Sequence, residues 1–384
     1  MSSRKLRIAF DASCLVDNHK SGVARYTEAL ITNLAKDYGE VELVGHYCNF
    51  LGRCKNLELP QAPNISYRPT RLLPAKVLNL LRRLRLPIPF ELLIKGRADF
   101  HLFPAFIGWP SLFKTPSAPV IYDLTYLDFP EVVSKRARHD LVTFVPKAIK
   151  RAKFVITISE VSALSLRKHY GLTEQDIVVT HIPSELAKRP SEAVAKSELE
   201  KLNISQPFIL FLGNLEPRKN LLTLLAAYKS LEPGLQERFA LVVAGGKGWH
   251  DDAILSELDS LQKAGTNIIQ TGYVTDGQRA ALFETASIFV LPSLYEGFGM
   301  TLLEAMSYDV PVIASDIAIF REVCGDAALY FDSASPHQLA QQLKNLLSDA
   351  RLQSKLIAGG KTNLKRFSWQ QNTNKIYKRI GASK

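Results

Sequence analysis

The chain of 384 residues is 46% hydrophobic and 22% charged, a composition typical of a soluble globular protein with room for two domains of ordinary size. No apolar run reaches the length of a membrane span, and Asp11 interrupts the apolar run near the N-terminus, so we expect neither a membrane helix nor a signal peptide. The four cysteines form no CxxC pair, which argues against a zinc site and favours a reducing, cytoplasmic setting.

The formal net charge of +11 is distributed unevenly along the chain. Residues 1–190 contain 28 lysines and arginines against 17 acidic residues, residues 191–350 contain 11 against 20, and residues 351–384 contain 9 against none. This alternation predicts two electrostatically distinct domains. If the basic tail packs back on the first domain, all the excess positive charge lies on one lobe.

Short apolar runs alternate with amphipathic helical patterns along the whole chain. In the first half we expect a helix at 23–38 and strands at 6–12, 41–48, 98–104, 118–124 and 153–159. The second half repeats the plan, with a terminal helix at 367–380 and strands at 207–214, 239–246, 267–274, 287–293 and 311–316. Near-continuous apolar strands separated by helices predict parallel sheets that are covered on both faces.

We therefore predict an α/β protein with two doubly wound, Rossmann-like domains that face each other across a cleft. The domain boundary lies near 183–206, a polar stretch that contains Pro183 and Pro190. The predicted parts are an N-terminal domain over 1–185, a C-terminal domain over 186–366, and a helix over 367–384 that packs back toward the N-terminal domain. Ligands of such sheets bind beyond the carboxyl ends of the strands, so the loops there are the candidate site.

The first candidate loop, GNLEPRKN at 213–220, directly follows a predicted strand. Gly213 lets the backbone approach a ligand, and Arg218 and Lys219 place two cations near the start of the next helix. A guanidinium and an ammonium together suit a diphosphate, because arginine binds it in a bidentate manner and lysine acts as a point charge. The alternative is a solvated turn with ordinary surface cations.

The second candidate loop, YEGFGMTLLEAM at 295–306, carries two glutamates on either side of a Gly-Phe-Gly break. The glycines predict a loop, and the apolar spacing after Met300 predicts a helix, so Glu296 lies in the loop and Glu304 lies one turn into the helix. Amides at such a helix start form an anion site. Two carboxylates could also catalyse glycoside hydrolysis, but a hydrolase does not need a phosphate site.

Taken together, these stretches resemble the retaining glycosyltransferases of family 4, which have the GT-B fold. The span from Glu296 to Glu304 is similar to the EX7E motif of that family. The likeness extends over most of the chain, in segments at 21–27, 122–131, 154–162, 213–221, 242–249, 271–278, 290–299, 311–316 and 367–369. It leans toward the mannosyltransferase-like subgroup that acts in cell-surface polysaccharide biosynthesis.

The resemblance implies roles for individual residues. Arg218 and Lys219 bind the donor diphosphate, Glu304 binds the ribose, and Glu296 lies at the sugar. The implied catalytic residues are Glu296, Arg218, Lys219, Asp123 and Tyr122. The implied donor-binding residues are Gly22, Gly213, Asn214, Arg218, Lys219, Tyr273, Val274, Glu296, Gly297, Phe298, Gly299, Met300, Thr301 and Glu304. The C-terminal domain would bind the nucleotide-sugar and the N-terminal domain the acceptor.

The implied chemistry is departure of the nucleoside diphosphate with retention at the anomeric carbon. Cations and helix amides stabilise the leaving diphosphate, and the leaving phosphate helps to deprotonate the acceptor hydroxyl on the same face. Closure of the two lobes excludes water. The scheme needs no metal and no cofactor, since Arg218 and Lys219 take the place of a cation.

Several positions depart from the usual family pattern. Tyr122 stands where related sequences carry a histidine expected to contact the donor sugar, and tyrosine does not readily accept a proton near neutral pH. Thr301 replaces a proline, Asp309 replaces a glycine, and HIPSE at 181–185 replaces a segment that commonly ends in Asn-Gly. These departures bear on donor identity and on activity, and leave the fold expectation intact.

Two basic stretches lie in the first half of the chain. Residues 65–90 contain six cations and no acidic residue, and the cations are interleaved with the leucines of RLLPAKVLNLLRRLRL (71–86). They are Arg68, Arg71, Lys76, Arg82, Arg83 and Arg85. A second run spans Lys135 to Lys153. A basic amphipathic helix of this kind is typical of an anionic membrane surface, and the alternative is a solvated helix face. Aromatic residues are not interleaved with the charges, which argues against nucleic acid.

We therefore expect a hexosyltransferase that moves a hexose from a nucleotide-diphospho-sugar, with GDP-mannose as the first candidate, to a lipid-linked glycan. It would be cytoplasmic and peripheral at the inner face of the cytoplasmic membrane, which it contacts through the regions Arg71–Arg97 and Lys135–Lys153. One alternative is a sugar-nucleotide epimerase on the GT-B fold. Another is a catalytically silent homologue that binds a sugar-nucleotide or a glycan, in which Glu296→Ala would leave the biological role unchanged.

Overall fold

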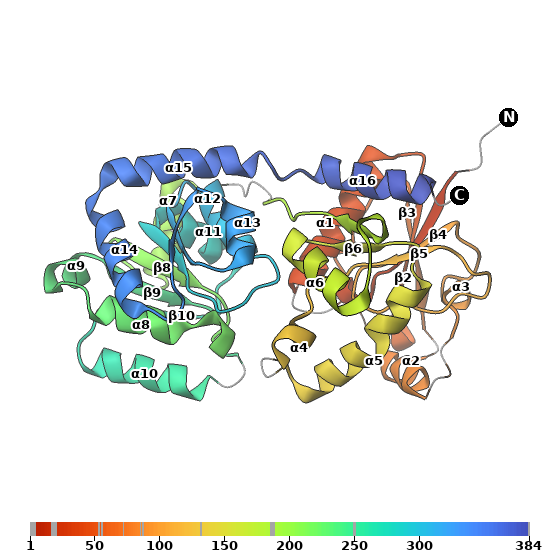
Figure 1. Cartoon of the computed structure of the whole chain (residues 1–384), viewed down its shortest axis with the longest axis horizontal. Coiled ribbons are helices and arrows are strands. Elements are labelled where there is room, and N and C mark those ends of the chain that lie inside the picture. Colours follow the sequence, from red (N-terminus) through yellow and green to blue (C-terminus); the bar gives the residue numbers. More distant parts are fainter. Residues whose placement is uncertain are drawn as a thin grey trace. The chain divides into compact units, whose positions relative to one another are not determined.

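The computed structural model divides the chain into two compact units, Met1–Ile182 with Ser368–Lys384, and Pro183–Phe367 (Figure 1). It describes residues 5–16, 21–52, 54, 57–71, 73–84, 86, 88–130, 133–184, 189–248 and 251–382. The expected domain boundary at 185/186 and Arg85 of the first basic stretch lie outside these residues. No helix in the described ranges combines the length and the apolarity that crossing a bilayer requires.

The first unit is built on a five-stranded parallel sheet in the order β3-β2-β1-β4-β5. A separate parallel pair, β6-β7, follows it and is linked to it by an isolated bridge between Val120 and Ile156. The strands are β1 (Arg7–Asp11), β2 (Glu42–Cys48), β3 (Ile65–Thr70), β4 (Phe100–Phe103), β5 (Ser117–Pro119), β6 (Val155–Thr157) and β7 (Ile177–Val179).

Helices of the first unit begin at side-chain caps that the sequence supplies. Ser21, Ser134 and Ser159 accept hydrogen bonds from backbone amides three residues onward, which satisfies free N–H groups at the starts of α1, α5 and α6. The helices are α1 (Gly22–Asp37), α2 (Ala75–Arg83), α3 (Phe90–Leu93), α4 (Thr125–Asp128), α5 (Lys135–Arg151), α6 (Glu160–Tyr170) and α16 (Trp369–Gly381). Short 3₁₀ turns lie at Ser13–Val16, Phe50–Gly52 and Glu174–Asp176.

The C-terminal helix α16 packs within the first unit, against α1 and the segment after β7. Asn372 donates to the carbonyl of His181 at 2.6 Å, and the Thr373 hydroxyl donates to Asp37 at 2.6 Å. The ring of Tyr377 stacks on that of Tyr38 with centroids 3.9 Å apart. The tail of the chain is therefore held by polar and aromatic contacts to residues far away in sequence.

The second unit contains a six-stranded parallel sheet in the order β10-β9-β8-β11-β12-β13. All five residues of β8 and all five of β9 are buried, as expected of strands covered by helices on both faces. The strands are β8 (Phe208–Leu212), β9 (Ala240–Ala244), β10 (Ile268–Gly272), β11 (Ile288–Leu291), β12 (Val312–Ser315) and β13 (Ala328–Phe331).

Amphipathic helices cover this sheet and share one large core with it, which includes Phe211, Leu224, Val243, Leu258 and Leu343. Thr275 and Gln278 form a reciprocal capping box at the start of α11. The helices are α7 (Glu192–Glu200), α8 (Leu221–Lys229), α9 (Pro233–Arg238), α10 (Asp252–Lys263), α11 (Asp276–Thr285), α12 (Met300–Ser307), α13 (Ala318–Cys324), α14 (Pro336–Ser348) and α15 (Ala350–Leu364), with a 3₁₀ turn at Pro217–Lys219.

The observed elements differ from the sequence expectation in length and in number. The strand expected at 118–124 is only three residues long, and beyond Pro119 the chain passes from β4 to β6, where Val120 bridges Ile156. The helix expected over 71–86 begins at Ala75, because Pro74 occupies its N-cap, and its C-cap is Leu84. Strands β3, β7 and β13 were not expected; β3 is an edge strand that contains Arg68 and Pro69, so its apolar pattern is weak.

Candidate active site

The two candidate loops lie side by side because they follow adjacent strands of the second unit. The loop with Gly213, Arg218 and Lys219 follows β8, and the loop with Glu296 follows β11, which pairs with β8 in parallel. The strand order reverses between β8 and β11, since β9 lies on one side and β12 on the other. Loops at such a switch point diverge and leave room for a ligand beyond the carboxyl ends of the strands.

Glu296 is the centre of a charged cluster that joins the two loops. Its Oε2 accepts a hydrogen bond from Arg218 Nη1 at 2.9 Å, and its Oε1 pairs with Lys219 Nζ and accepts from Ser293 Oγ at 3.0 Å. Arg218 Nε also donates to Glu216 at 2.8 Å. Two cations and two carboxylates therefore balance one another within the cluster.

Burial and charge act in opposite directions on this cluster. Burial raises the pKa of the Glu296 carboxyl, but Lys219 and Arg218 outweigh it and hold that pKa below its ordinary value. Burial lowers the pKa of the Arg218 guanidinium, and Glu296 and Glu216 outweigh it and raise that pKa. Glu296 is therefore an ionised carboxylate at neutral pH, in a form that accepts hydrogen bonds but does not donate a proton.

Two glycines set the backbone close to this cluster. Gly299, the residue before α12, has φ 94°, and a Cβ there would lie 2.9 Å from the ring of Phe320. Gly245, after β9, has φ 148°, and a Cβ there would lie 2.0 Å from the carbonyl oxygen of Gly213. Both positions require glycine, the first for the turn into α12 and the second for close packing of the loops after β8 and β9.

Glu304 lies in α12 as expected, and its partner is a residue that sequence reasoning missed. Arg279 in α11 donates from Nε to Glu304 Oε1 at 2.6 Å and also pairs with Oε2, so the ion pair is bidentate. Both side chains are about one-fifth to one-quarter exposed. The only sequence signal was a cation in the segment TDGQR, just after the predicted donor-binding residues Tyr273 and Val274.

The remaining candidates of the second unit lie around the same strand ends. Tyr273 is 74% exposed and Val274 is half-buried, both in the turn between β10 and α11. Asn214 is exposed and donates to Glu216 at 3.5 Å. Gly297, Met300 and Thr301 are half-buried at the start of α12, while Phe298 is buried with its ring edge-on to Phe367.

The predicted residues Gly22, Tyr122 and Asp123 belong to the first unit. Gly22 is the exposed first residue of α1. The Tyr122 hydroxyl is buried and donates to the carbonyl of Pro104 at 2.8 Å, and burial raises its pKa well above the ordinary tyrosine value. Asp123 accepts from the amide and the hydroxyl of Thr125, at 3.0 and 2.6 Å.

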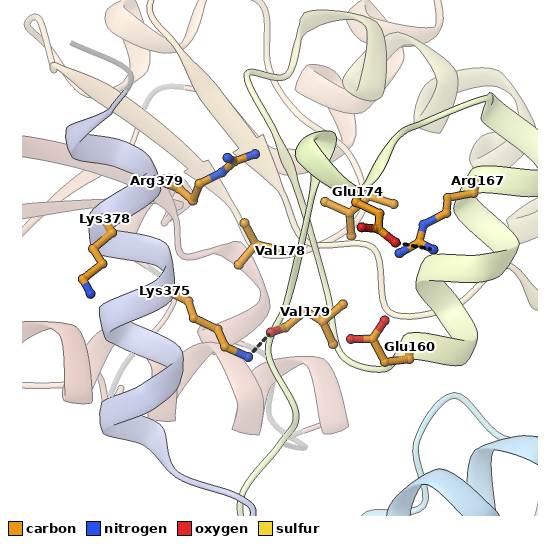
Figure 2. Close-up of a pocket in the computed structure, with 9 residues that line it drawn as sticks. Glu160, Arg167, Glu174, Val178, Val179, Lys375, Lys378 and Arg379 are labelled. Carbon is orange, nitrogen blue, oxygen red and sulfur yellow. Dashed lines mark hydrogen bonds and ion pairs between the residues drawn. The ribbon is translucent and has the colours of Figure 1, made fainter.

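No cluster of three or more potential metal-ligating side chains occurs in the part of the chain that the structure describes. A cavity of about 520 Å³ lies in the first unit between α6, β7 and α16 and contains none of the predicted site residues. Figure 2 shows partners for three of its charged groups: Lys375 donates to the carbonyl of Val179 at 3.1 Å, and Arg167 pairs with Glu174 at 3.4 Å.

Comparison with known proteins identifies the second unit. Residues 195–363, which contain Gly213, Arg218, Lys219, Glu296 and Glu304, match the family described as glycosyl transferases group 1. The second unit is a glycosyltransferase group 1 domain. The whole chain is homologous to O-antigen chain mannosyltransferase B of Escherichia coli, with 28% identity over 367 residues, 92% of this chain and 94% of the relative.

The glycosyltransferase is also similar to the serotype-specific mannosyltransferase WbdA of Escherichia coli, with 30% identity over 236 residues. That match covers 57% of this chain and only 28% of the much longer WbdA. These homologues and the group 1 domain together support a hexosyltransferase, as the sequence predicted.

Solved structures establish the fold of this glycosyltransferase as GT-B. Sucrose-phosphate synthase from Thermosynechococcus elongatus aligns with a TM-score of 0.74 at 17% identity, over 99% of this chain and all of the other. HepE of Anabaena, in complex with UDP and glucose, aligns at 0.69 and 14% identity over 98% and 100% of the two chains. WaaG, a glycosyltransferase of lipopolysaccharide biosynthesis, aligns at 0.65 and 15% over 96% and 98%.

Proposed function

We propose that this glycosyltransferase transfers a hexose, with retention of configuration, from a nucleotide-diphospho-sugar to a lipid-linked glycan in surface polysaccharide biosynthesis. GDP-mannose is the first candidate donor, on the strength of the homology with the O-antigen mannosyltransferases. The observation that carries the proposal is the convergence of Arg218, Lys219 and Glu296 at the strand-order reversal beside β8 and β11.

In the proposed reaction, Arg218 and Lys219 bind the donor diphosphate and stabilise the charge that develops as it departs. With the donor bound, Arg218 and Lys219 contact both the diphosphate and Glu296. The Glu296 carboxylate holds the two cations in position. Amides at the start of α12 add to the same stabilisation. Glu304, oriented by the bidentate contact with Arg279, accepts hydrogen bonds from the ribose hydroxyls.

The bond changes of the proposed transfer balance without a metal or a cofactor. The bond between the anomeric carbon and the diphosphate oxygen breaks, and its electron pair leaves with the nucleoside diphosphate. The acceptor hydroxyl forms the new bond on the same face, and its proton passes to the leaving phosphate. Tyr122, whose hydroxyl is buried and hydrogen-bonded to Pro104, takes no part in this proton transfer.

We further propose that the first unit docks on an anionic membrane through α2 and α5. Figure 1 shows these helices beside each other, and Arg83 of α2 donates to Asp140 of α5. Val77 and Leu80 of α2 are 37% and 54% exposed, and the C-cap residue Leu84 is 59% exposed. Exposed apolar side chains next to basic residues suit the interface of a bilayer.

Several of the basic residues expected to contact lipid have partners inside the unit. Arg138 donates to the carbonyl of Tyr126 at 3.3 Å, and Arg97 and Lys147 lie over the rings of Phe113 and Phe144. Arg83 pairs with Asp140, and the Arg82 guanidinium lies over the rings of Trp109 and Phe144, 5.8 and 5.0 Å from their centroids. The proposed lipid contact therefore rests on the other cations of Arg71–Arg97 and Lys135–Lys153, and the enzyme would be peripheral at the inner face of the cytoplasmic membrane.

A transfer assay tests the proposed function. The purified protein is incubated with extracted lipid-linked glycans and radiolabelled GDP-mannose, UDP-glucose, ADP-glucose or TDP-glucose, and the configuration of the product is read by NMR. We expect label transfer from one nucleotide family, retention at the anomeric carbon, and a loss of at least about 100-fold in rate in Arg218→Ala. Absence of transfer from every donor, or full activity of Arg218→Ala, contradicts the proposal.

A further inference from the structure

A second cavity, of about 350 Å³, lies in the first unit where β4 and β5 begin. His101 from β4 and Ser117 from β5 line it, together with Trp109, Lys114 and Thr115 of the preceding loop and Arg151 at the end of α5. Neither the donor cluster of the second unit nor the proposed transfer reaction uses any of these residues.

His101 is a buried polar side chain whose hydrogen-bonding groups are unsatisfied. It is 0% exposed, and neither ring nitrogen has a hydrogen-bond partner among the described residues. Its ring is held edge-on by Phe90 and Phe103, with centroids 5.1 and 5.9 Å away. Burial lowers its pKa to about 4, against the attraction of Glu91, so the imidazole is neutral at neutral pH.

A neutral imidazole offers one N–H donor and one acceptor nitrogen. A hydroxyl group can both donate and accept a hydrogen bond, so hydroxyls of a ligand satisfy both nitrogens without forcing a proton onto the buried ring. A bare anion satisfies only the donor. The floor of the cavity therefore favours a ligand with hydroxyl groups.

The rim of the cavity has a different character, because it carries two cations. Lys114 and Arg151 are exposed, and neither forms an ion pair with any residue in the described ranges. The hydroxyl of Ser117, which is buried, lies 3.5 Å from the carbonyl of Arg151. Two cations beside a hydroxyl suit a phosphate group.

The buried carboxylate of Glu91 holds this rim in shape. It accepts hydrogen bonds from the Ser111 hydroxyl, from the Leu112 amide at 3.1 Å and from the Thr115 hydroxyl at 3.2 Å. Its charge is thus satisfied within the loop that carries Lys114. The loop is fixed in place before any ligand arrives, which lowers the entropic cost of binding.

We propose that this cavity binds a phosphate ester that bears free hydroxyl groups, with the phosphate between Lys114 and Arg151 and the hydroxyls toward His101. Such a group occurs in a soluble sugar phosphate and in the glycerol phosphate head group of a lipid. The larger groove at α16 is a weaker candidate, since Arg167 and Lys375 there already have partners within the unit.

Calorimetric titration of the full chain with mannose 1-phosphate tests the soluble source, with inorganic phosphate and mannose as separate probes. We expect mannose 1-phosphate to bind more tightly than either probe. Arg151→Gln should weaken it by about tenfold, the loss expected of one charge-assisted hydrogen bond, and Ser117→Ala by a smaller factor. Lys150→Gln is the matched control, because it removes a neighbouring charge of α5 outside the cavity. Neither Lys150→Gln nor Arg218→Gln should change the affinity for mannose 1-phosphate.

Co-sedimentation with vesicles tests the lipid source. Phosphatidylglycerol and phosphatidylserine carry the same net charge, but the glycerol head group presents a phosphate ester with free hydroxyls. We expect preference for phosphatidylglycerol that Arg151→Gln abolishes and Lys150→Gln preserves, if lipid is the source. The proposal is overturned if neither mannose 1-phosphate nor phosphatidylglycerol binds, or if inorganic phosphate binds as tightly as mannose 1-phosphate. It is also overturned if only Arg218→Gln weakens binding, because the ligand would then lie at the donor cluster.

Discussion

Replacing Glu296 by glutamine removes the one negative charge that Arg218 and Lys219 share, while keeping the size and most hydrogen bonds of the side chain. The side chains of Glu296, Lys219 and Arg218 are 10%, 12% and 26% exposed. Breaking a fully buried ion pair costs about 3–5 kcal/mol. Because the amide still accepts a hydrogen bond and Arg218 keeps Glu216, we expect a loss of about 2–3 kcal/mol.

In a unit of this size, that loss lowers the thermal unfolding midpoint by roughly 5–10 °C. The folded-state pKa of Glu296 is depressed, so its stabilisation is fully present above the ordinary glutamate pKa and is lost as the pH falls through the depressed value. The gap between wild type and Glu296→Gln should therefore be constant from neutral to mildly acidic pH, and should close only in stronger acid.

Differential scanning calorimetry between neutral and acidic pH measures this gap. Glu232→Gln is the matched control, because its ion pair with Lys344 is 65% and 55% exposed and its removal should shift the midpoint by less than about 2 °C. Equal midpoints for wild type and Glu296→Gln at neutral pH would refute the reasoning. So would a gap that stays the same after the carboxyl has been protonated.

Substitutions at three further positions probe other contacts. Arg279→Lys cannot keep the bidentate contact with Glu304 and should raise the donor KM about three- to tenfold, in steady-state kinetics, with little change in unfolding midpoint. Asp309 has φ 61° and forms ion pairs with Arg189 and Lys361. Asp309→Ala keeps the left-handed strain and loses these ion pairs, so it should lower the unfolding midpoint. Asp309→Gly relieves the strain and should have a midpoint within about 2 °C of wild type. Burial raises the pKa of Glu91, but hydrogen bonds from Ser111 and neighbouring amides keep that pKa below its ordinary value. Glu91→Gln should therefore lower the free energy of unfolding by about 1–3 kcal/mol at neutral pH and progressively less in acid. Urea denaturation measures this loss.

Elements with strong local signals were predictable from the sequence. The apolar run at 207–214 became β8, buried along its length, and the helical spacing after Gly299 became α12 with Glu304 inside it. These elements depend on burial and periodicity, which are written locally in the chain. The convergence of Arg218 and Glu296 was implied only by the family resemblance, since the pairing of β8 with β11 joins distant parts of the chain.

Contacts that depend on tertiary packing were not predictable. The partner of Glu304 is Arg279, 25 positions away on another helix, and nothing in the local pattern of α11 marks it. Strand β3 escaped prediction because an edge strand is only half-buried and tolerates Arg68 and Pro69. Likewise, the interaction of Arg82 with Trp109 and Phe144 exists only once α2 packs against the first unit.

The most direct test of the donor cluster is a calorimetric titration of GDP-mannose, and of the corresponding UDP-, ADP- and TDP-sugars, into the wild-type protein and Arg218→Gln. We predict saturable binding of one nucleotide family that weakens by at least about tenfold when the guanidinium is removed, since it makes charge-assisted hydrogen bonds to the diphosphate. If no nucleotide-sugar binds, or if Arg218→Gln binds as tightly as wild type, Arg218, Lys219 and Glu296 do not form the donor site.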